Sequence, residues 1–359
     1  MPADLSIRAV LAGSRFRDCA LAVETPVPLE RADLLSKDLG RRIYIKREDR
    51  VDDLGCGNKL RKLHYVLHDA REAGIDTLIT LGSLPSNQCK AVARMAKQNG
   101  MQAHLVYGGD VQQRPASAHG SYLLASLFDP RISWFERTPW PELEAKLTGI
   151  HDAEVDAGRS PLIIRSGVSH WPGMIGSLEL ALETARQLRE QGKDKVDIVC
   201  TAGSGGTAVG FQLAAELFGL DHAVHGICIG EPSAGLAAKT EMLAQEAYDA
   251  LGLARRAATP LHLHDVAIGR AYDQPDDGEL AIMKEGVSRY GLLLDPNYML
   301  KTFIGLRHLV RHDRMRKDAA TVMIHTGGQL GLFDNNRDMT SWHRREYPDW
   351  ITAEMGVGS

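Results

Sequence analysis

Short runs of apolar and β-branched residues alternate with longer stretches of helical period from about residue 43 to residue 333. Strands that alternate with helices pair in parallel, because each helix carries the chain back to the starting edge of the sheet. The pattern predicts an α/β chain whose open, twisted, mainly parallel sheets are flanked by helices on both faces. The expected strands are 42–46, 77–81, 103–107, 132–135, 162–165, 196–201, 224–229 and 321–325, and the expected helices are 59–73, 87–99, 115–127, 173–191, 206–218, 278–290 and 297–311.

Chain length predicts more than one domain, because 359 residues exceed what a single hydrophobic core usually organises. No internal repeat is visible. Two polar stretches, 137–160 and 270–279, are expected to be loops or irregular joins.

Composition excludes several classes of protein. A net charge of -4 gives no reason to expect nucleic acid or a membrane surface as partner, and no apolar run reaches the length of a membrane span. The N-terminus shows no secretory signal. Five scattered cysteines without a Cys-x-x-Cys pair predict a reduced, cytoplasmic protein with no metal site.

Lys59 stands where a glycine-containing loop, 53–58, meets the apolar face of the next predicted helix. A lysine held at such a junction points at one fixed position. An amine shielded from water there stays nucleophilic and can form a Schiff base with an aldehyde cofactor. A plainer interpretation is a helix start that is merely basic, since Arg61 and Lys62 follow closely.

The segment 201–207, Thr-Ala-Gly-Ser-Gly-Gly-Thr, joins a predicted strand to a predicted helix. Its glycines let backbone N–H groups converge at the positive end of the helix dipole, which is a phosphate-binding arrangement. No Gly-Lys-Ser/Thr follows, which argues against a P-loop for nucleoside triphosphates. Gly203-x-Gly205-x-x-Ala208 fits a relaxed dinucleotide fingerprint, which leaves an NAD-dependent oxidoreductase as an alternative. Its acidic partner, Glu231, stands farther along than that fingerprint expects.

Polar residues follow three further strand ends. Ser86 and Asn87 can cap the next helix or receive a carboxylate or ring hydroxyl from a ligand. Tyr272 and Tyr298 precede or enter predicted helices, where a tyrosine is usually a packing residue, and Thr326 can offer a hydroxyl or cap a helix. Because parallel strands place ligands at their carboxyl ends, these groups together predict one pocket.

Six motifs resemble, in this order, the D-cysteine desulfhydrase / 1-aminocyclopropane-1-carboxylate deaminase family: Lys46-Arg-Glu-Asp49, Gly57-Asn-Lys-x-Arg-Lys-Leu63, Ser86-Asn-Gln88, Gly203-Ser-Gly-Gly-Thr207, Asp295-Pro-x-Tyr298 and His325-Thr-Gly-Gly328. The resemblance covers about residues 20 to 335. It implies a pyridoxal 5'-phosphate enzyme of the tryptophan synthase β-like fold (fold type II), with two sheets. It also implies a large cofactor-binding domain from 1–61 and 176–359, and an inserted small domain, 62–175, that closes over the active site.

The same resemblance assigns roles to individual residues. Lys59 is expected to be the Schiff-base lysine, Asn87 to meet the cofactor's ring hydroxyl, and Ser86 to lie against the substrate carboxylate or α-carbon. The tyrosine pair of the family falls on Tyr298 and Tyr272. The expected catalytic residues are therefore Lys59, Ser86, Tyr298 and Tyr272, and the expected cofactor-binding residues are Asn58, Lys59, Asn87, Gly203, Ser204, Gly205, Gly206, Thr207 and Thr326, with no metal ligand.

Met299 departs from the family pattern at a position that bears on the substrate. In the cyclopropane-opening deaminases the residue after the Asp-Pro-x-Tyr tyrosine is an acid that pairs with the pyridine nitrogen, and a thioether cannot do this. Without a carboxylate the cofactor is a weaker electron sink, and Thr326 is left to offer a neutral hydrogen bond. A weaker sink suffices when a good leaving group departs from the β-carbon.

The sequence therefore predicts a pyridoxal-phosphate-dependent lyase that eliminates a β-substituent from a small amino acid, giving pyruvate and ammonia. Lys59 is expected to act as both covalent anchor and general base. Further departures at Cys56, at 84–85 and in 166–172 leave the leaving group and the D- or L-configuration open. A 1-aminocyclopropane-1-carboxylate deaminase and a β-replacement synthase are alternatives within the family, and the family habit implies a homodimer.

Overall fold

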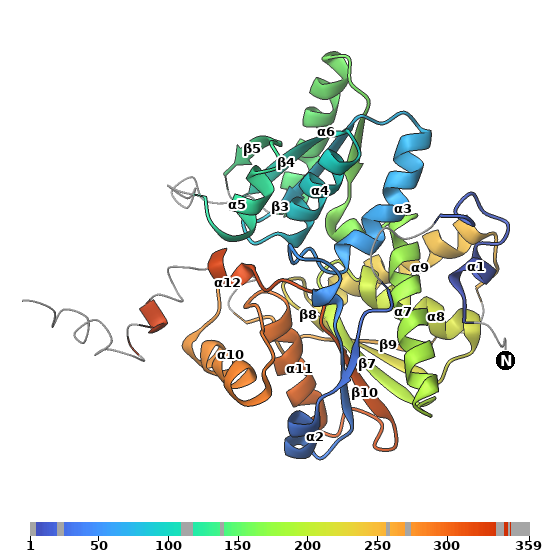
Figure 1. The fold of residues 1–359 in the computed structure, drawn as a ribbon, viewed down its shortest axis with the longest axis vertical. Coiled ribbons are helices and arrows are strands. Elements are labelled where there is room, and N and C mark those ends of the chain that lie inside the picture. Colours follow the sequence, from blue (N-terminus) through green and yellow to red (C-terminus); the bar gives the residue numbers. More distant parts are fainter. Residues whose placement is uncertain are drawn as a thin grey trace, which may run out of the picture.

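Two sheets organise the protein. The computed structural model describes residues 5–19, 25–108, 118–136, 140–255, 259–269, 274–334, 341–343 and 345. In Figure 1 the sheets form two lobes, the smaller at the top and the larger below. The predicted pair of mainly parallel sheets is confirmed, because every strand pair is parallel except β1 with β2.

The larger sheet has the order β1-β2-β10-β7-β8-β9. Its strands are β1 (Leu29–Arg31), β2 (Ile43–Lys46), β10 (Ala320–Ile324), β7 (Val196–Ala202), β8 (His222–Cys228) and β9 (Leu261–His264). Every residue of the three central strands β2, β10 and β7 is buried. This explains why they read as continuous apolar runs in the sequence.

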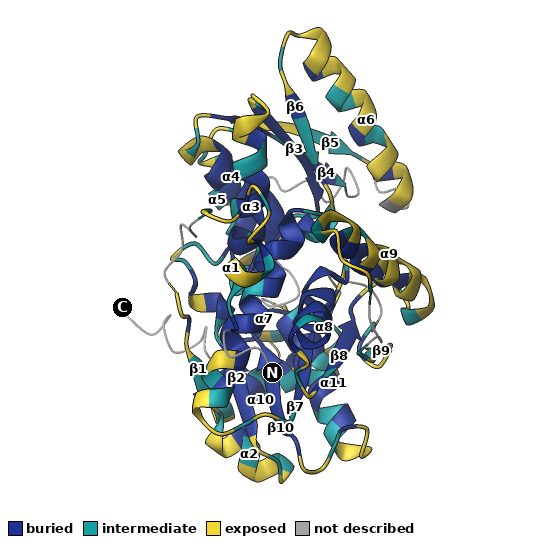
Figure 2. Ribbon diagram, turned by 90° about the vertical axis from the view of Figure 1, so that its right-hand side faces the viewer, coloured by how far each residue is buried: buried dark blue, intermediate teal, exposed yellow. Residues whose placement is uncertain are grey.

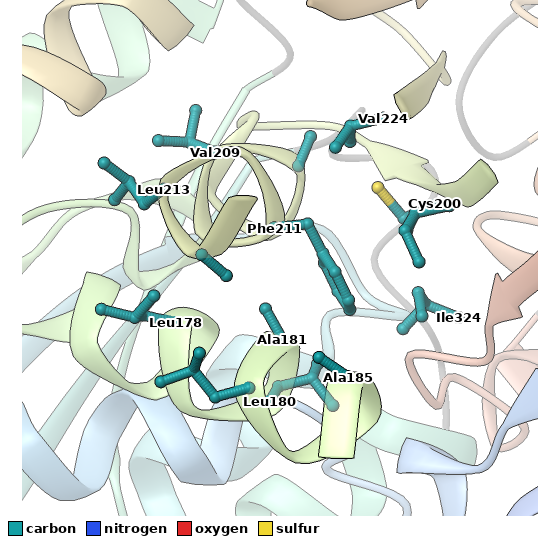
Figure 3. Close-up of a cluster of buried hydrophobic side chains, with 14 of the residues drawn as sticks. Leu178, Leu180, Ala181, Ala185, Cys200, Val209, Phe211, Leu213, Val224 and Ile324 are labelled. Atoms are coloured by element: carbon teal, nitrogen blue, oxygen red, sulfur yellow. The ribbon is translucent and has the colours of Figure 1, made fainter. Parts of the chain in front are cut away.

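Helices cover both faces of the larger sheet. Packed on one face are α7 (Gly173–Glu190) and α8 (Gly206–Phe218), and Phe211 of α8 lies in one buried cluster with strand residues such as Cys200 and Ile324 (Figure 3). The opposite face is covered by α2 (Asp33–Leu39), α10 (Asp277–Tyr290) and α11 (Met299–Arg311). Figure 2 shows that the central strands are buried and that the outward faces of the helices are exposed.

The smaller sheet has the order β5-β4-β3-β6 and is inserted between β2 and β7 of the larger one. Its strands are β5 (Arg131–Phe135), β4 (Gln102–Gly108), β3 (Thr77–Gly82) and β6 (Pro161–Ile164). One face packs on α3 (Lys59–Glu72), α4 (Asn87–Gln98) and α5 (Gly120–Ser126), and the other on α6 (Trp140–Asp156). The predicted domain boundaries, 61/62 and 175/176, fall inside α3 and α7 and stay a prediction.

The remaining elements are short or peripheral. They are α1 (Ile7–Val10), α9 (Ser233–Leu251), α12 (Gly331–Asp334) and two 3-10 turns, η1 (Glu48–Arg50) and η3 (Ser166–Val168). Among the described residues no helix is long and apolar enough to cross a membrane, and no group of three or more metal-binding side chains is gathered. The five cysteines are free.

The prediction that 137–160 is irregular is wrong, because α6 occupies most of it. Its apolar residues, Leu143, Leu147 and Ile150, recur at helical spacing and face the sheet, but polar and charged residues are interspersed among them and obscure the pattern. In the second stretch predicted to be irregular, residues 270–273 lie outside the described part, and α10 begins earlier than expected, at Asp277. A capping box between Asp276 and Glu279 starts that helix. Strands β1 and β9 and helices α2 and α9 were not predicted.

Candidate active site

A close backbone approach fixes the start of α3. Gly57 has φ +60, and a Cβ there would lie 2.0 Å from the carbonyl oxygen of Thr326. The loop before Lys59 therefore packs directly on the loop that follows β10, and the Asn58 N–H donates to the same carbonyl at 3.3 Å. Only glycine allows both the backbone conformation and the contact.

The Lys59 amine is held by its neighbour. Its Nζ donates to Asn58 Oδ1 at 2.9 Å, and Asn58 Nδ2 donates to Thr207 Oγ1 at 3.0 Å. Burial lowers the pKa of Lys59 to about 8. A much larger share of this amine is neutral near pH 7 than for a surface lysine, and the neutral form is the nucleophile.

The glycine-rich loop between β7 and α8 forms a cradle at the helix start. Gly205 takes φ +81 at the N-cap of α8, and no side chain caps the helix, so its first N–H groups remain available to an anion. Ser204 Oγ lies 2.8 Å from Ser169 Oγ. A Cβ on Gly206 would lie 2.1 Å from that same Ser169 oxygen, so the position requires glycine.

Lys62 also reaches the cradle, and sequence reasoning missed it. Its side chain is buried, its Nζ donates to the Gly167 carbonyl at 3.0 Å, and that Nζ lies 2.8 Å from where a Cβ of Gly206 would stand. Burial and the nearby Lys59 hold the pKa of Lys62 well below its usual range. A protonated amine beside the positive end of α8 is electrostatically unfavourable unless an anion lies between them. The i, i+3 spacing from Lys59 was a usable signal, since it puts both amines on one side of α3.

The turn after β3 supplies Ser86 and Asn87. Ser86 Oγ accepts the Cys89 N–H at 3.1 Å and caps α4, so the capping interpretation is confirmed. Asn87 is buried, and among the described residues its Oδ1 accepts no hydrogen bond. An acceptor buried without a partner costs free energy, which a ligand hydroxyl would recover. Gln88 fixes the turn through Thr80 Oγ1 (2.6 Å) and the carbonyl of Arg165 (3.0 Å).

The start of α11 positions Tyr298 and Met299. Buried Asp295 accepts the N–H groups of Tyr298 at 2.8 Å and of Met299 at 2.9 Å, which holds both residues in place. Met299 Sδ then receives the Thr326 N–H at 3.3 Å. A thioether is a weak acceptor and carries no charge, so no ionised group stands at this position.

The structure therefore gathers most of the predicted site. Hydrogen bonds join Lys59 and Asn58 to the cradle and to Thr326, and Thr326 to Met299. The turn before Ser86 reaches the same region, because a Cβ on Gly331 would lie 3.8 Å from both Pro85 and Asp295 Cβ. Tyr272 lies outside the described residues. Nothing on the described surface places Glu231 as a nucleotide partner, since it pairs with Lys239 at 2.7 Å.

These groups fit pyridoxal phosphate. The uncapped helix start and Lys62 suit its phosphate, the orphaned Asn87 oxygen suits a ring hydroxyl, and the shielded Lys59 amine suits its aldehyde. A dinucleotide would leave Lys59 and Asn87 without a function.

Comparison with known proteins agrees with this reading. Residues 21–327 match the family described as pyridoxal-phosphate dependent enzyme. D-cysteine desulfhydrase of Salmonella paratyphi B is 32% identical over 313 residues, covering 87% of this chain and 94% of the relative. The Serratia proteamaculans enzyme of the same name is 31% identical over 314 residues, with the same coverage.

One solved structure gives the same family, and a second shows the same fold. A crystal structure of an ACC deaminase homologue aligns with a TM-score of 0.83 at 31% identity, covering 94% of this chain and 98% of that one. Threonine deaminase isoform 2 of Solanum lycopersicum shares the fold, with a TM-score of 0.63 at 18% identity, covering 94% of this chain and 87% of that one. The chain belongs to the pyridoxal-phosphate-dependent enzymes of fold type II, in the lyase family that contains D-cysteine desulfhydrase.

Proposed function

We propose that this enzyme eliminates a β-substituent from a small amino acid, as D-cysteine desulfhydrase is named for doing, and yields pyruvate and ammonia. The observation that carries the proposal is the half-buried Lys59 amine, which has a lowered pKa and is linked through Asn58 to the phosphate cradle. In this proposal the amine binds the cofactor aldehyde and then acts as a base.

Pyridoxal phosphate, when bound, withdraws electrons from the α-carbon of an amino acid and makes its proton removable. With the cofactor bound, Lys59 would hold its aldehyde and would later take the α-proton of the substrate. The electron pair of the broken C–H bond forms a double bond to the β-carbon as the β-substituent leaves. Water hydrolyses the released enamine to pyruvate and ammonia.

The other residues hold the cofactor or orient the substrate. Lys62 and the N–H groups at Gly206 bind the phosphate, and Asn87 accepts the ring hydroxyl. Ser86, at the N-terminus of α4, receives the substrate carboxylate. Tyr298, with Tyr272 as the second member of the pair, supplies the proton that the departing group needs. The small lobe, 62–175, closes over the site.

Met299 favours elimination over ring opening. Its uncharged sulfur receives both the N–H and the hydroxyl of Thr326, so uncharged side chains, and no carboxylate, would face the ring nitrogen. The weaker electron withdrawal suits substrates whose β-substituent leaves at once, such as a thiol, and is poorly suited to opening an unactivated ring.

The test of the anchor is Lys59→Ala. The purified wild type is expected to absorb near ~420 nm through its lysine-bound cofactor, and the variant is expected to lose this band and all pyruvate release. Equal absorbance in both proteins would refute the assignment. Lys62→Met serves as a partner variant, because it is expected to weaken cofactor binding and still show the band at saturating cofactor.

The substrate is tested by pyruvate release from D- and L-cysteine, cysteate, β-chloroalanine, serine and 1-aminocyclopropane-1-carboxylate (followed as ammonia). Turnover of the β-substituted alanines and not of the cyclopropane is expected. Strong turnover of the cyclopropane would make the deaminase the correct assignment and overturn the argument from Met299. A new amino acid formed on adding a thiol would identify a β-replacement synthase.

We also propose that the enzyme works in the cytoplasm as a homodimer. Five free cysteines, four of them buried, suit a reducing compartment. Light scattering of the purified holoenzyme is expected to give twice the 39.3 kDa chain mass.

A further inference from the structure

A hollow on the small lobe lies on the other side of its sheet from Lys59. The helix that begins at Lys59 packs on one face of this sheet, and α6 packs on the opposite face (Figures 1 and 2). Between α6 and strands β4 and β5 is an open pocket whose lining includes His104, Ser133, Phe135, Lys146, Glu154 and Arg159. The lyase chemistry uses none of these side chains.

Three of the lining residues form a hydrogen-bonded line. Ser133 Oγ lies 2.8 Å from His104 Nε2, and His104 Nδ1 lies 2.7 Å from Glu154 Oε1. The serine and the histidine come from adjacent strands and point to the same face, while the carboxylate comes from α6. A hydroxyl on one ring nitrogen and a carboxylate on the other is the geometry of a nucleophilic triad.

The charge of Glu154 determines which atoms of the hydrogen-bonded series Ser133–His104–Glu154 carry protons. Burial opposes ionisation of this carboxyl, but hydrogen bonds from His104, Arg131 and Arg159 outweigh it and lower the pKa of Glu154 to about 2. An ionised carboxylate only accepts, so Nδ1 of a neutral His104 must carry its proton. Nε2 is then the acceptor and the Ser133 hydroxyl the donor, as a general base requires.

The pocket around Ser133, His104 and Glu154 suits the acyl group of an ester, whose carbonyl oxygen becomes negatively charged during the reaction. Phe135 and Ile150 supply apolar lining, and the Lys146 ammonium stands 4.8 Å from the centre of the Phe135 ring. Arg159, which also lines the pocket, pairs with the second oxygen of Glu154. Cations at this position favour an oxyanion over a neutral carbonyl.

We propose that Ser133, His104 and Glu154 form a second nucleophilic centre that cleaves small carboxylic esters. Ser133 Oγ bonds to the ester carbonyl carbon and gives its proton to His104 Nε2. The bond to the alcohol oxygen breaks, and the alcohol leaves with that proton. Water then attacks the acyl-serine and releases the carboxylic acid, which restores the serine. Ser133 and His104 are catalytic residues, and Glu154 is a positioning residue.

The first test is covalent labelling of the purified holoenzyme by a fluorophosphonate, which reacts with activated serines. One adduct on the peptide that carries Ser133 is expected, abolished in Ser133→Ala and slowed about 100-fold or more in His104→Gln. Ser126→Ala, in α5 of the same lobe, is the matched control and should label as the wild type does. Thermal melting and cofactor absorbance report that each variant is folded. No adduct on Ser133 in folded wild type, or undiminished labelling in His104→Gln, overturns the proposal.

The second test measures p-nitrophenyl acetate hydrolysis at saturating cofactor, which keeps Lys59 occupied. Ser133→Ala is expected to lose about 100-fold or more of the wild-type rate, and a rate equal to that of Ser126→Ala refutes the proposal. The effect of Glu154→Gln is measured as the pH dependence of the fluorophosphonate labelling rate. Around the imidazole stand Glu154 and the permanently charged Arg131, Arg159 and Lys146. The wild-type labelling rate should rise with pH, and the Gln variant should lose this rise because its amide can leave the proton of the neutral imidazole on Nε2. An unchanged profile contradicts the positioning role.

Discussion

Lys62 gives the sharpest test of how the cofactor is held. Replacing it by methionine keeps the length and apolar stem of the side chain and removes the amine that lies 2.8 Å from the Gly206 Cβ position. In the protein without cofactor, burial and the nearby Lys59 disfavour the protonated form of this amine. Lys62→Met should therefore fold normally and bind cofactor less well.

The size of the loss follows from the interaction removed. A hydrogen bond between a charged donor and a phosphate contributes about 1.5–3 kcal/mol. The dissociation constant should rise roughly 10- to 150-fold, at about 1.4 kcal/mol for each factor of ten. Lys301→Met is the matched control, since Lys301 is another buried lysine whose Nζ donates to a backbone carbonyl, that of Ile268. Its effect on affinity should stay within about twofold.

The ligand for this assay is pyridoxine 5'-phosphate, which carries an alcohol in place of the aldehyde and so cannot react with Lys59. Titration calorimetry of the apoprotein gives its affinity. A bound phosphate should raise the lowered pKa of Lys62, so binding takes up a proton and affinity falls as pH rises. This fall should be steeper in the wild type than in Lys62→Met. Equal losses in both lysine variants, or equal pH slopes in wild type and Lys62→Met, would show that the amine does not meet the phosphate.

Three further outcomes are expected. Arg61→Met removes the ion-pair partner of buried Glu48 and one of the two cations beside buried Glu183, and should lower the free energy of unfolding by about 3–5 kcal/mol in urea melts; a loss below about 1 kcal/mol contradicts this. Gly57→Ala should cost about 1–3 kcal/mol more than Gly40→Ala, which shares the positive φ but has open space where Gly57 meets Thr326; equal losses would mean that the contact does not matter. The rate at which the apoprotein captures pyridoxal should rise with pH to a midpoint near 8 as Lys59 loses its proton, and a midpoint near the ordinary lysine value of about 10.4 would refute the shielding.

The sequence predicted the strands that are buried along their whole length and the helices that begin after a recognisable N-cap residue. Central strands such as β7 are buried along their whole length, so their apolar runs mark them in the sequence. Helix α4 begins directly after Ser86, as its cap predicts. The helix α6 was not predicted, because it touches the sheet along one narrow stripe, and most of its surface is polar. The edge strands β1 and β9 are short and only partly buried, so their sequences carry little pattern.

The site was predictable to the extent that it depends on local conformation. Lys59 after a glycine loop and the glycines before α8 are recognisable from neighbouring residues alone. Lys62 was treated as ordinary helix-start charge, because its proximity to Gly206 depends on the packing of α3 against the loop that carries Gly167. The Ser133 line was invisible for the same reason, since its members come from two strands and a helix.

The sequence by itself determined the alternation of strands and helices, the glycines that permit close approach, and the identity of the lysine and the thioether. These properties are local, because hydrogen bonding, backbone conformation and side-chain chemistry act over a few residues. Only the tertiary structure decided which amines are shielded, which oxygens lack partners and which side chains meet across the sheet. Desolvation and hydrogen-bond geometry depend on atoms that are distant in the chain, so the lowered pKa of Lys59 and the orphaned oxygen of Asn87 exist only in the folded protein.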